Sequence, residues 1–140
     1  MKNTTFLLLA LLMLSLGTAC KKDNNNDDDK KDDPQVDTEK PTLNLVQPIE
    51  GATFENGDTM HIHAVITDNE TVHDVAVAIT RTNDDSEIFH AHYHFDAASA
   101  EVDTFYIISV PIHSDLILRV EASDHSENDT AISRGYHIMM

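Results

Sequence analysis

The stretches MHIHAVI at residues 60–66 and FHAHYHF at residues 89–95 decide the fold class of this 140-residue chain. In both stretches every second residue is apolar, and histidines occupy positions between the apolar ones. Successive side chains of a β-strand point to opposite faces, so this alternation predicts two strands with one apolar face each. We expect the apolar faces to pack inward, which leaves the histidines on the outer faces.

The same period of two continues through most of the chain after Pro41. It predicts further strands at residues 43–45, 75–79, 102–110, 116–122 and 130–138. Turn-forming residues fill 47–58 and 82–86, and we expect loops at 67–70, 96–101 and 123–129. About seven short strands separated by turns indicate an all-β fold, an antiparallel β-sandwich. No segment combines a helical period with helix caps, which argues against a helical bundle.

The N-terminus has the pattern of an export signal. Lys2 precedes an apolar run from Phe6 to Leu16, which is shorter than the roughly 20 residues that a transmembrane helix needs. Small residues follow, and then Cys20, the only cysteine of the chain. This segment resembles a bacterial lipobox, which implies a signal peptide over 1–19, lipidation of Cys20 and a membrane anchor. The alternative is an ordinary signal peptide that leaves Cys20 as a free thiol.

Residues 21–33, KKDNNNDDDKKDD, contain no apolar side chain, so we expect 20–40 to be a disordered tether and 41–140 to be the folded domain. The Lys- and Asp-rich segment resembles the one that follows the lipidated cysteine in Bacteroidota-type lipoproteins. That resemblance implies display on the cell surface at the outer membrane, although a plain spacer facing the periplasm stays open. The formal net charge of −16 argues against a nucleic-acid partner.

Two stretches of the expected domain resemble bacterial immunoglobulin-like domains. LNLVQPIEGATFENGDTMHIHAVITDNETVHDVAVAI (43–79) is similar to their first half, and LILRVEASDHSEND (116–129) to their penultimate strand and the turn after it. Glu127 stands where that turn usually has glycine. The paired strand histidines are similar to those of uncharacterised Bacteroidota-type lipoproteins with such a domain. The resemblance implies an immunoglobulin-like sandwich.

The outward histidines are the first candidate site. Same-face neighbours on a strand lie about 6–7 Å apart, so adjacent imidazoles can converge on one metal ion. Imidazole suits Zn²⁺ and Cu²⁺. Whether the two histidine strands share one site stays open, as do simple surface histidines and a pH-sensitive patch. The candidate ligands are His61, His63, His90, His92 and His94.

An acidic set of loop residues is the second candidate. The loops at 67–70 and 123–129 are expected at the same end of the sandwich, and hard oxygen ligands suit Ca²⁺. The alternative is that Asp and Asn only form turns there. The residues concerned are Asp68, Asn69, Glu70, Asp124, Asn128 and Asp129.

The sequence gives little support to catalysis. The chain after Cys20 has no cysteine nucleophile, and it contains neither a Gly-rich phosphate loop nor a Gly-x-Ser-x-Gly motif. Two non-enzymatic functions follow: a metal-binding surface module for zinc or copper, or a module that binds a protein or glycan through its loops or an edge strand.

Overall fold

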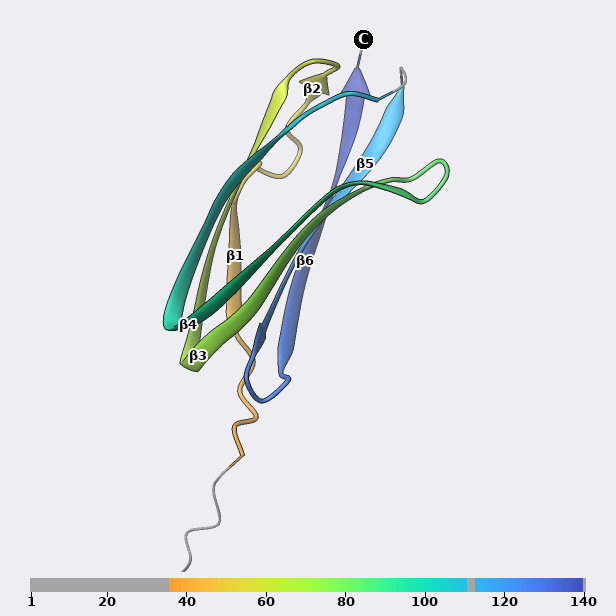
Figure 1. The fold of residues 1–140 in the computed structure, drawn as a ribbon. Coiled ribbons are helices and arrows are strands. Elements are labelled where there is room, and N and C mark those ends of the chain that lie inside the picture. Colours follow the sequence, from red (N-terminus) through yellow and green to blue (C-terminus); the bar gives the residue numbers. More distant parts are fainter. Residues whose placement is uncertain (1–35, 111–112, 140) are drawn as a thin grey trace, which may run out of the picture. The chain divides into compact units, whose positions relative to one another are not determined.

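The computed structural model describes residues 36–110 and 113–139, which belong to one compact unit, Pro34–Met140. These residues form strands and no helix, which confirms the all-β fold class. The expected signal peptide, Cys20 and residues 21–35 of the expected tether lie outside the described residues. The strands are β1 (Thr42–Gln47), β2 (Phe54–Glu55), β3 (Thr59–Arg81), β4 (Ser86–Ile107), β5 (Ser114–Asp124) and β6 (Asp129–Met139) (Figure 1).

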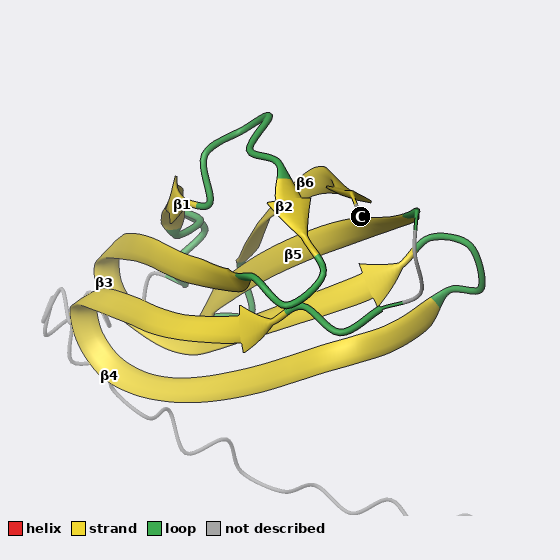
Figure 2. Cartoon of the chain, turned by 90° about the horizontal axis from the view of Figure 1, so that it is seen from above, coloured by secondary structure: helices red, strands yellow, loops and turns green. Residues whose placement is uncertain are grey.

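The strands form one curled sheet in the order β1-β3-β5-β6-β2, and β4 pairs with β3 outside this path. β3 has three neighbours because β4 runs along one of its edges, while β1 and β5 share the other edge. The first half of β3 lies beside β1, and its second half lies beside β5. Figure 2 shows the β3–β4 pair curling over the remaining strands. The short β2 is parallel to β6 and the other pairs are antiparallel, so the sheet is mixed.

Two expected loops are wrong, because residues 67–70 lie inside β3 and residues 96–101 inside β4. Four expected short strands are therefore two long ones. The two strands bend together where their pairing is interrupted, between Thr67 and Val72. A continuous bent pair retains its ladder of hydrogen bonds on both sides of the bend. The strand expected at 102–110 also ends earlier, at Ile107.

The core is built from the inward faces that the alternation predicted. On β3 the buried positions are 60, 62, 64 and 66 before the bend, and 72, 75, 77 and 79 after it. The largest fully buried side chains include Ile62, Ile79 and Leu118. On β4 the His92 side chain is 55% exposed, whereas Tyr93 packs against the core. The predicted facing of this strand is thus confirmed.

The turn between β5 and β6 has Glu127 at the position where glycine was expected, and its backbone still adopts the left-handed conformation there. Glu127 has a φ of 64°, in the left-handed region that glycine enters at the least steric cost. Asp124 closes the turn, because its carboxylate accepts hydrogen bonds from the backbone N–H of Asn128 at 2.8 Å and from its Nδ2 at 2.6 Å. The turn therefore retains the backbone conformation of a glycine turn with a glutamate in that position.

Candidate metal centre

A β-bulge in β3 places two neighbouring side chains on the outer face. On β5 the partners of Val72 and Asp74 are Asp124 and Ser123, which are consecutive, so His73 is an extra residue in β3. Val72 and Val75 are both buried, and His73 and Asp74 between them are both partly exposed. An extra residue of this kind redirects side chains, and bulges are common beside functional sites.

The Asp74 carboxylate lies between three imidazoles. Its Oδ1 is 3.2 Å from His94 Nδ1 and 3.3 Å from His92 Nε2, and its Oδ2 is 3.3 Å from His73 Nδ1. His94 is the register partner of Asp74 on β4, which accounts for their contact. The hydrogen bond with His94 holds the pKa of the Asp74 carboxyl below its usual value. Asp74 is therefore an anion at neutral pH, and its carboxylate lies among imidazole nitrogen atoms of a type that can bind metals.

The turn after β5 and the next residues of β4 extend this group. His125 Nε2 lies 3.1 Å from Asp96 Oδ1, and His94 Nε2 lies 3.8 Å from Asp96 Oδ2. The ring centroid of His73 is 4.4 Å from that of His94 and 4.0 Å from that of His125. We call these residues the His–Asp cluster: His73, Asp74, His92, His94, Asp96 and His125.

One ligand atom from each of His73, Asp74 and His94 lies within 4.8 Å of the other two. Metal–ligand bonds of about 2.0–2.2 Å fit between atoms at this spacing after small side-chain rotations. Two imidazoles and a carboxylate form a donor set that zinc and copper accept, and His92 and His125 can add further nitrogen ligands. The cluster is thus chemically suited to a transition metal.

The structure brings together only part of the predicted histidine set. His92 and His94 belong to the cluster, while His90 instead contacts Glu87, with 3.1 Å between Nδ1 and Oε1. His61 and His63 lie on the first half of β3, where their register partners are Phe105 and Asp103. His63 Nε2 lies 2.9 Å from Glu101 Oε1.

The two histidine groups are separated because the halves of β4 pair with different halves of β3. His90, His92 and His94 face the second half of β3, whereas His61 and His63 lie in its first half. Sequence reasoning missed His73 and His125. The sequence contained a signal for His73, because the apolar positions change from even numbers at Val72 to odd numbers at Val75, and in one continuous strand this change requires an inserted residue between them.

The predicted oxygen ligands are also divided. Asp68 and Asp124 do come together, and Asp37, which was not predicted, joins them with one carboxylate oxygen from each residue within 4.8 Å of the others. Asn69 and Asn128 donate hydrogen bonds to this group. Glu70 and Asp129 are exposed and outside it.

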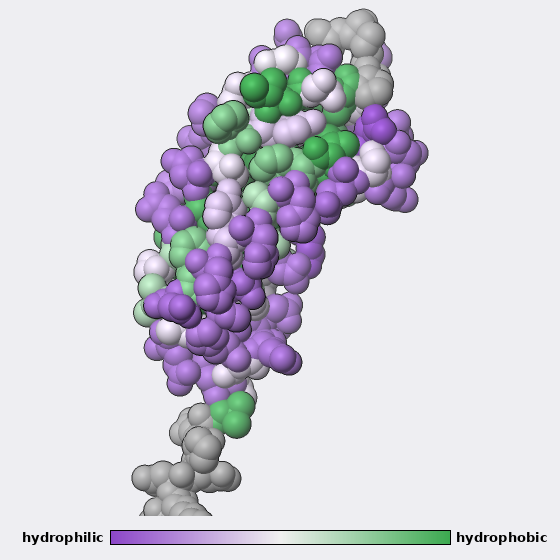
Figure 3. Space-filling model, in the orientation of Figure 1, coloured by the Kyte–Doolittle hydropathy of each residue, from purple (hydrophilic) through white to green (hydrophobic). Residues whose placement is uncertain are grey.

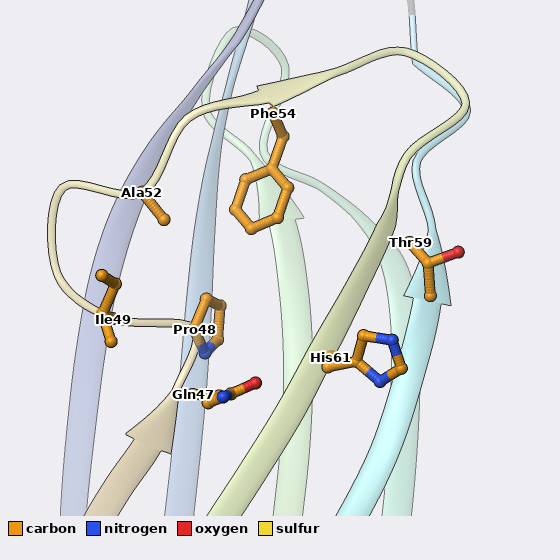
Figure 4. A pocket seen from close by; sticks show the side chains of 7 residues that line it. All are labelled: Gln47, Pro48, Ile49, Ala52, Phe54, Thr59 and His61. Carbon is orange, nitrogen blue, oxygen red and sulfur yellow. The ribbon is translucent and has the colours of Figure 1, made fainter.

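An apolar surface lies at the other end of the domain. Figure 4 shows the Phe54 ring pointing into a hollow of about 260 Å³ that Pro48 and His61 also line. Nearby positions on the surface include large apolar side chains, with Ile49 67% exposed and both Phe105 and Ile107 56% exposed. Figure 3 shows apolar residues gathered over the upper part of the visible face and hydrophilic residues over the lower part.

Neither a protein-family model nor a curated protein matches this chain. Across residues 36–110 and 113–139, the structure contains no helix of the length and hydrophobicity needed to span a bilayer.

Proposed function

We propose that this chain is a lipid-anchored, non-enzymatic binding protein of the outer membrane that binds Zn²⁺ or Cu²⁺ through its His–Asp cluster. One observation carries the metal proposal: ligand atoms of His73, Asp74 and His94 lie within 4.8 Å of one another, with two further imidazoles in contact with the same group. The predicted ligand set is thereby revised, since His61, His63 and His90 are replaced by His73 and His125.

The ligands suit a site that acquires and releases its metal. His92, His94 and His125 have side chains 51–55% exposed, so an ion reaches them directly from solvent. Asp96 holds the His125 imidazole by a hydrogen bond, as carboxylates do in the outer shell of zinc sites, whereas Asp74 is itself a proposed ligand. Such an open site fits sequestration or transfer of metal at the cell surface better than a structural zinc site, which is closed by four protein ligands.

The proposed fold is an immunoglobulin-like sandwich. In constant-type sandwiches of this kind the first, second, fourth and fifth strands belong to one layer, and the third, sixth and seventh to the other. If the halves of β3 and β4 are counted as separate strands and the two-residue β2 is left out, the observed pairing supports this grouping for six of the seven strands. The fourth strand, the first half of β4, differs because it pairs with the second layer. The His–Asp cluster then lies on the outer face of that second layer.

The proposed anchor is a lipid on Cys20, after removal of residues 1–19, with 20–40 as the tether and the domain displayed on the cell surface. A Cys20→Ser variant tests the anchor, because it cannot be acylated on sulfur. The native chain should fractionate with membranes and the variant should not. Equal membrane association of both chains would contradict lipidation at Cys20.

The metal proposal is tested by calorimetry on the full chain, purified in detergent and stripped of metal with a chelator. We expect Zn²⁺ and Cu²⁺ to bind with micromolar or lower Kd. His73→Gln and His94→Gln should each raise the Kd by about 10–100-fold or more. His90→Gln is the matched control, since His90 lies on the same strand face but outside the cluster, and its Kd should be unchanged.

Two results would refute this site. The first is an absence of binding heat at neutral pH for both metals. The second is equal affinity for the native chain, the His73 variant and the His94 variant. A loss of binding in His90→Gln alone would favour the ligand set predicted from the sequence.

The alternative function is a protein- or glycan-binding module without a metal role. The exposed Phe105 and Ile107 and the apolar hollow beside Phe54 favour it, because contiguous exposed apolar surface is common at interaction sites. A Phe105→Ser/Ile107→Ser double variant separates the two functions. Zinc affinity should be retained in this variant, whereas binding to glycan arrays or outer-membrane extracts should be lost if the apolar surface is the functional one.

A further inference from the structure

The outer edge of β4 is a strand edge without a partner among the described strands. β4 is 22 residues long and pairs with β3 alone, so no strand pairs with the backbone N–H and C=O groups of its other edge. Figure 2 shows β4 along the outside of the sheet. Proteins usually protect such an edge with lysine, proline or a bulge, because an open edge can pair with another strand.

The segment FHAHYHF (89–95) of β4 has none of these protections. It contains no lysine, arginine, carboxylate or proline. Its register with β3 is regular from Phe89 to His94, so no bulge turns this part of the edge away from a second strand. Strand segments with aromatic side chains, low charge and no proline readily pair edge to edge. The chemistry of this edge therefore favours another β-strand as its partner.

The inward side chains of the same segment are incompletely covered. Phe89, Tyr93 and Phe95 pack against the core but stay partly exposed. The β3 residues beside this segment, Val75 and Ile79, are fully buried. A second strand on the edge would cover the three aromatic rings, because side chains directly opposite in an antiparallel pair lie about 4.5–5.5 Å apart.

The segment is nearly symmetric about His92, which points to a second copy of this chain as the partner. If two copies pair antiparallel about a two-fold axis at His92, Phe89 lies opposite the partner's Phe95. Ala91 then lies opposite the partner's Tyr93, so a small side chain meets a large one. Aromatic pairs across a strand pair stabilise it, and the two-fold axis forms each of these pairs twice.

The same pairing brings no like charges together. Histidines, which are formally neutral at pH 7, lie opposite histidines. The two carboxylates that flank the segment lie opposite apolar residues: Glu87 is opposite the partner's Ala97, and Asp96 is opposite the partner's Ile88. Like charges directly opposite would destabilise a strand pair, so this edge is self-complementary in charge as well as in shape.

We infer that two copies of this chain form a dimer by antiparallel pairing of their β4 edges, with the two-fold axis at His92. Both copies use the same edge, so the assembly closes at two chains. The sheets of the two copies continue into each other, and the histidines of both segments lie on one outer face. The pairing needs no metal ion, so it can be tested independently of the proposed metal site.

The test is sedimentation velocity of the full chain in detergent with excess chelator, over a range of chain concentrations. We expect monomer at low concentration and dimer at high concentration. His92→Lys should raise the Kd of the dimer about tenfold or more, because it places two ammonium groups opposite each other at the two-fold axis. The His92 side chain is 55% exposed, so the variant should fold, and circular dichroism checks this.

Two control variants separate the edge from other effects of the substitution. His92→Gln removes the same imidazole without adding a charge, and it should retain the dimer. Asn44→Lys adds the same charge at an exposed position of β1, and it should also retain the dimer.

A disulfide tests the position of the axis. His92→Cys should give a covalent dimer on a non-reducing gel after mild oxidation, because residue 92 faces its own copy at about the distance that a disulfide spans. Asn44→Cys should give none, and the native chain controls for Cys20, its only cysteine.

Three results would overturn the inference. The first is a native chain that stays monomeric up to about 100 µM, which would leave the edge to a strand of another protein. The second is a His92→Lys variant that dimerises as tightly as the native chain and as His92→Gln. The third is equal cross-linking of the two cysteine variants, which would show that the contact is not specific to β4.

Discussion

If the His–Asp cluster binds a transition metal as proposed, acidification should release the ion, and the pH dependence of the Kd should report the number of histidine ligands. A ligand imidazole must lose its proton before it binds metal, so the apparent Kd rises with acidity. Once the solution is acid enough to protonate free imidazole, each ligand histidine raises the Kd about tenfold per pH unit. His73 and His94 together therefore predict a rise of about one-hundredfold per pH unit.

Asp74 adds nothing to this slope. The hydrogen bond with His94 lowers the pKa of the Asp74 carboxyl from its usual 3.8, so the folded chain takes up this proton only at still lower pH. A carboxyl with a lowered pKa favours the folded state above its unfolded pKa, and this contribution is lost as the pH falls through the folded value. Between about pH 7.5 and 5, where histidine titrates, the slope thus reports imidazoles alone.

The assay is calorimetric measurement of the zinc Kd at half-unit steps from about pH 7.5 to 5 at constant ionic strength. The logarithm of Kd against pH should reach a slope of about −2, or a steeper one if His92 or His125 also binds the ion. His94→Gln should reduce the slope by one, whereas His90→Gln should leave it unchanged. A pH-independent Kd, or a slope that His94→Gln does not alter, would refute the assignment of imidazole ligands.

Three further predictions concern the fold. Leu118→Ala should lower the free energy of unfolding by about 2–5 kcal/mol in urea denaturation, because the side chain is fully buried, and a loss below about 1 kcal/mol would contradict its place in the core. Tyr136→Phe should lower the free energy of unfolding by about 1 kcal/mol in the same assay, since the Tyr136 hydroxyl donates a hydrogen bond to the Pro48 carbonyl at 3.0 Å. This loss should be smaller than that of Leu118→Ala, because the Pro48 carbonyl still accepts a hydrogen bond from Arg134 in the variant. Glu127→Gly should raise the thermal midpoint and increase the free energy of unfolding by up to about 1 kcal/mol, because glycine adopts the left-handed conformation of this position without a steric cost. A lowered midpoint would show that the glutamate side chain stabilises the turn.

The facing of individual strand residues could be predicted from the sequence because it depends on local geometry. Alternation with a period of two requires only that successive side chains point to opposite faces. It correctly placed Ile62 and Leu118 in the core and His92 on the outer face. The loops expected at 67–70 and 96–101 are strand residues in the structure. The sequence could not exclude these loops, because polar residues occur both in loops and in strands that bend while they remain paired.

Which candidate ligand residues lie close together was decided by the tertiary structure alone. The pairing of β3 with β4 places His94 opposite Asp74, and the bulge at His73 turns a further imidazole toward them. Asp37 joins Asp68 and Asp124 although they lie far apart in the sequence. A local pattern gives the face on which a side chain lies, whereas the register of paired strands determines its neighbours, and register depends on contacts between residues distant in the chain.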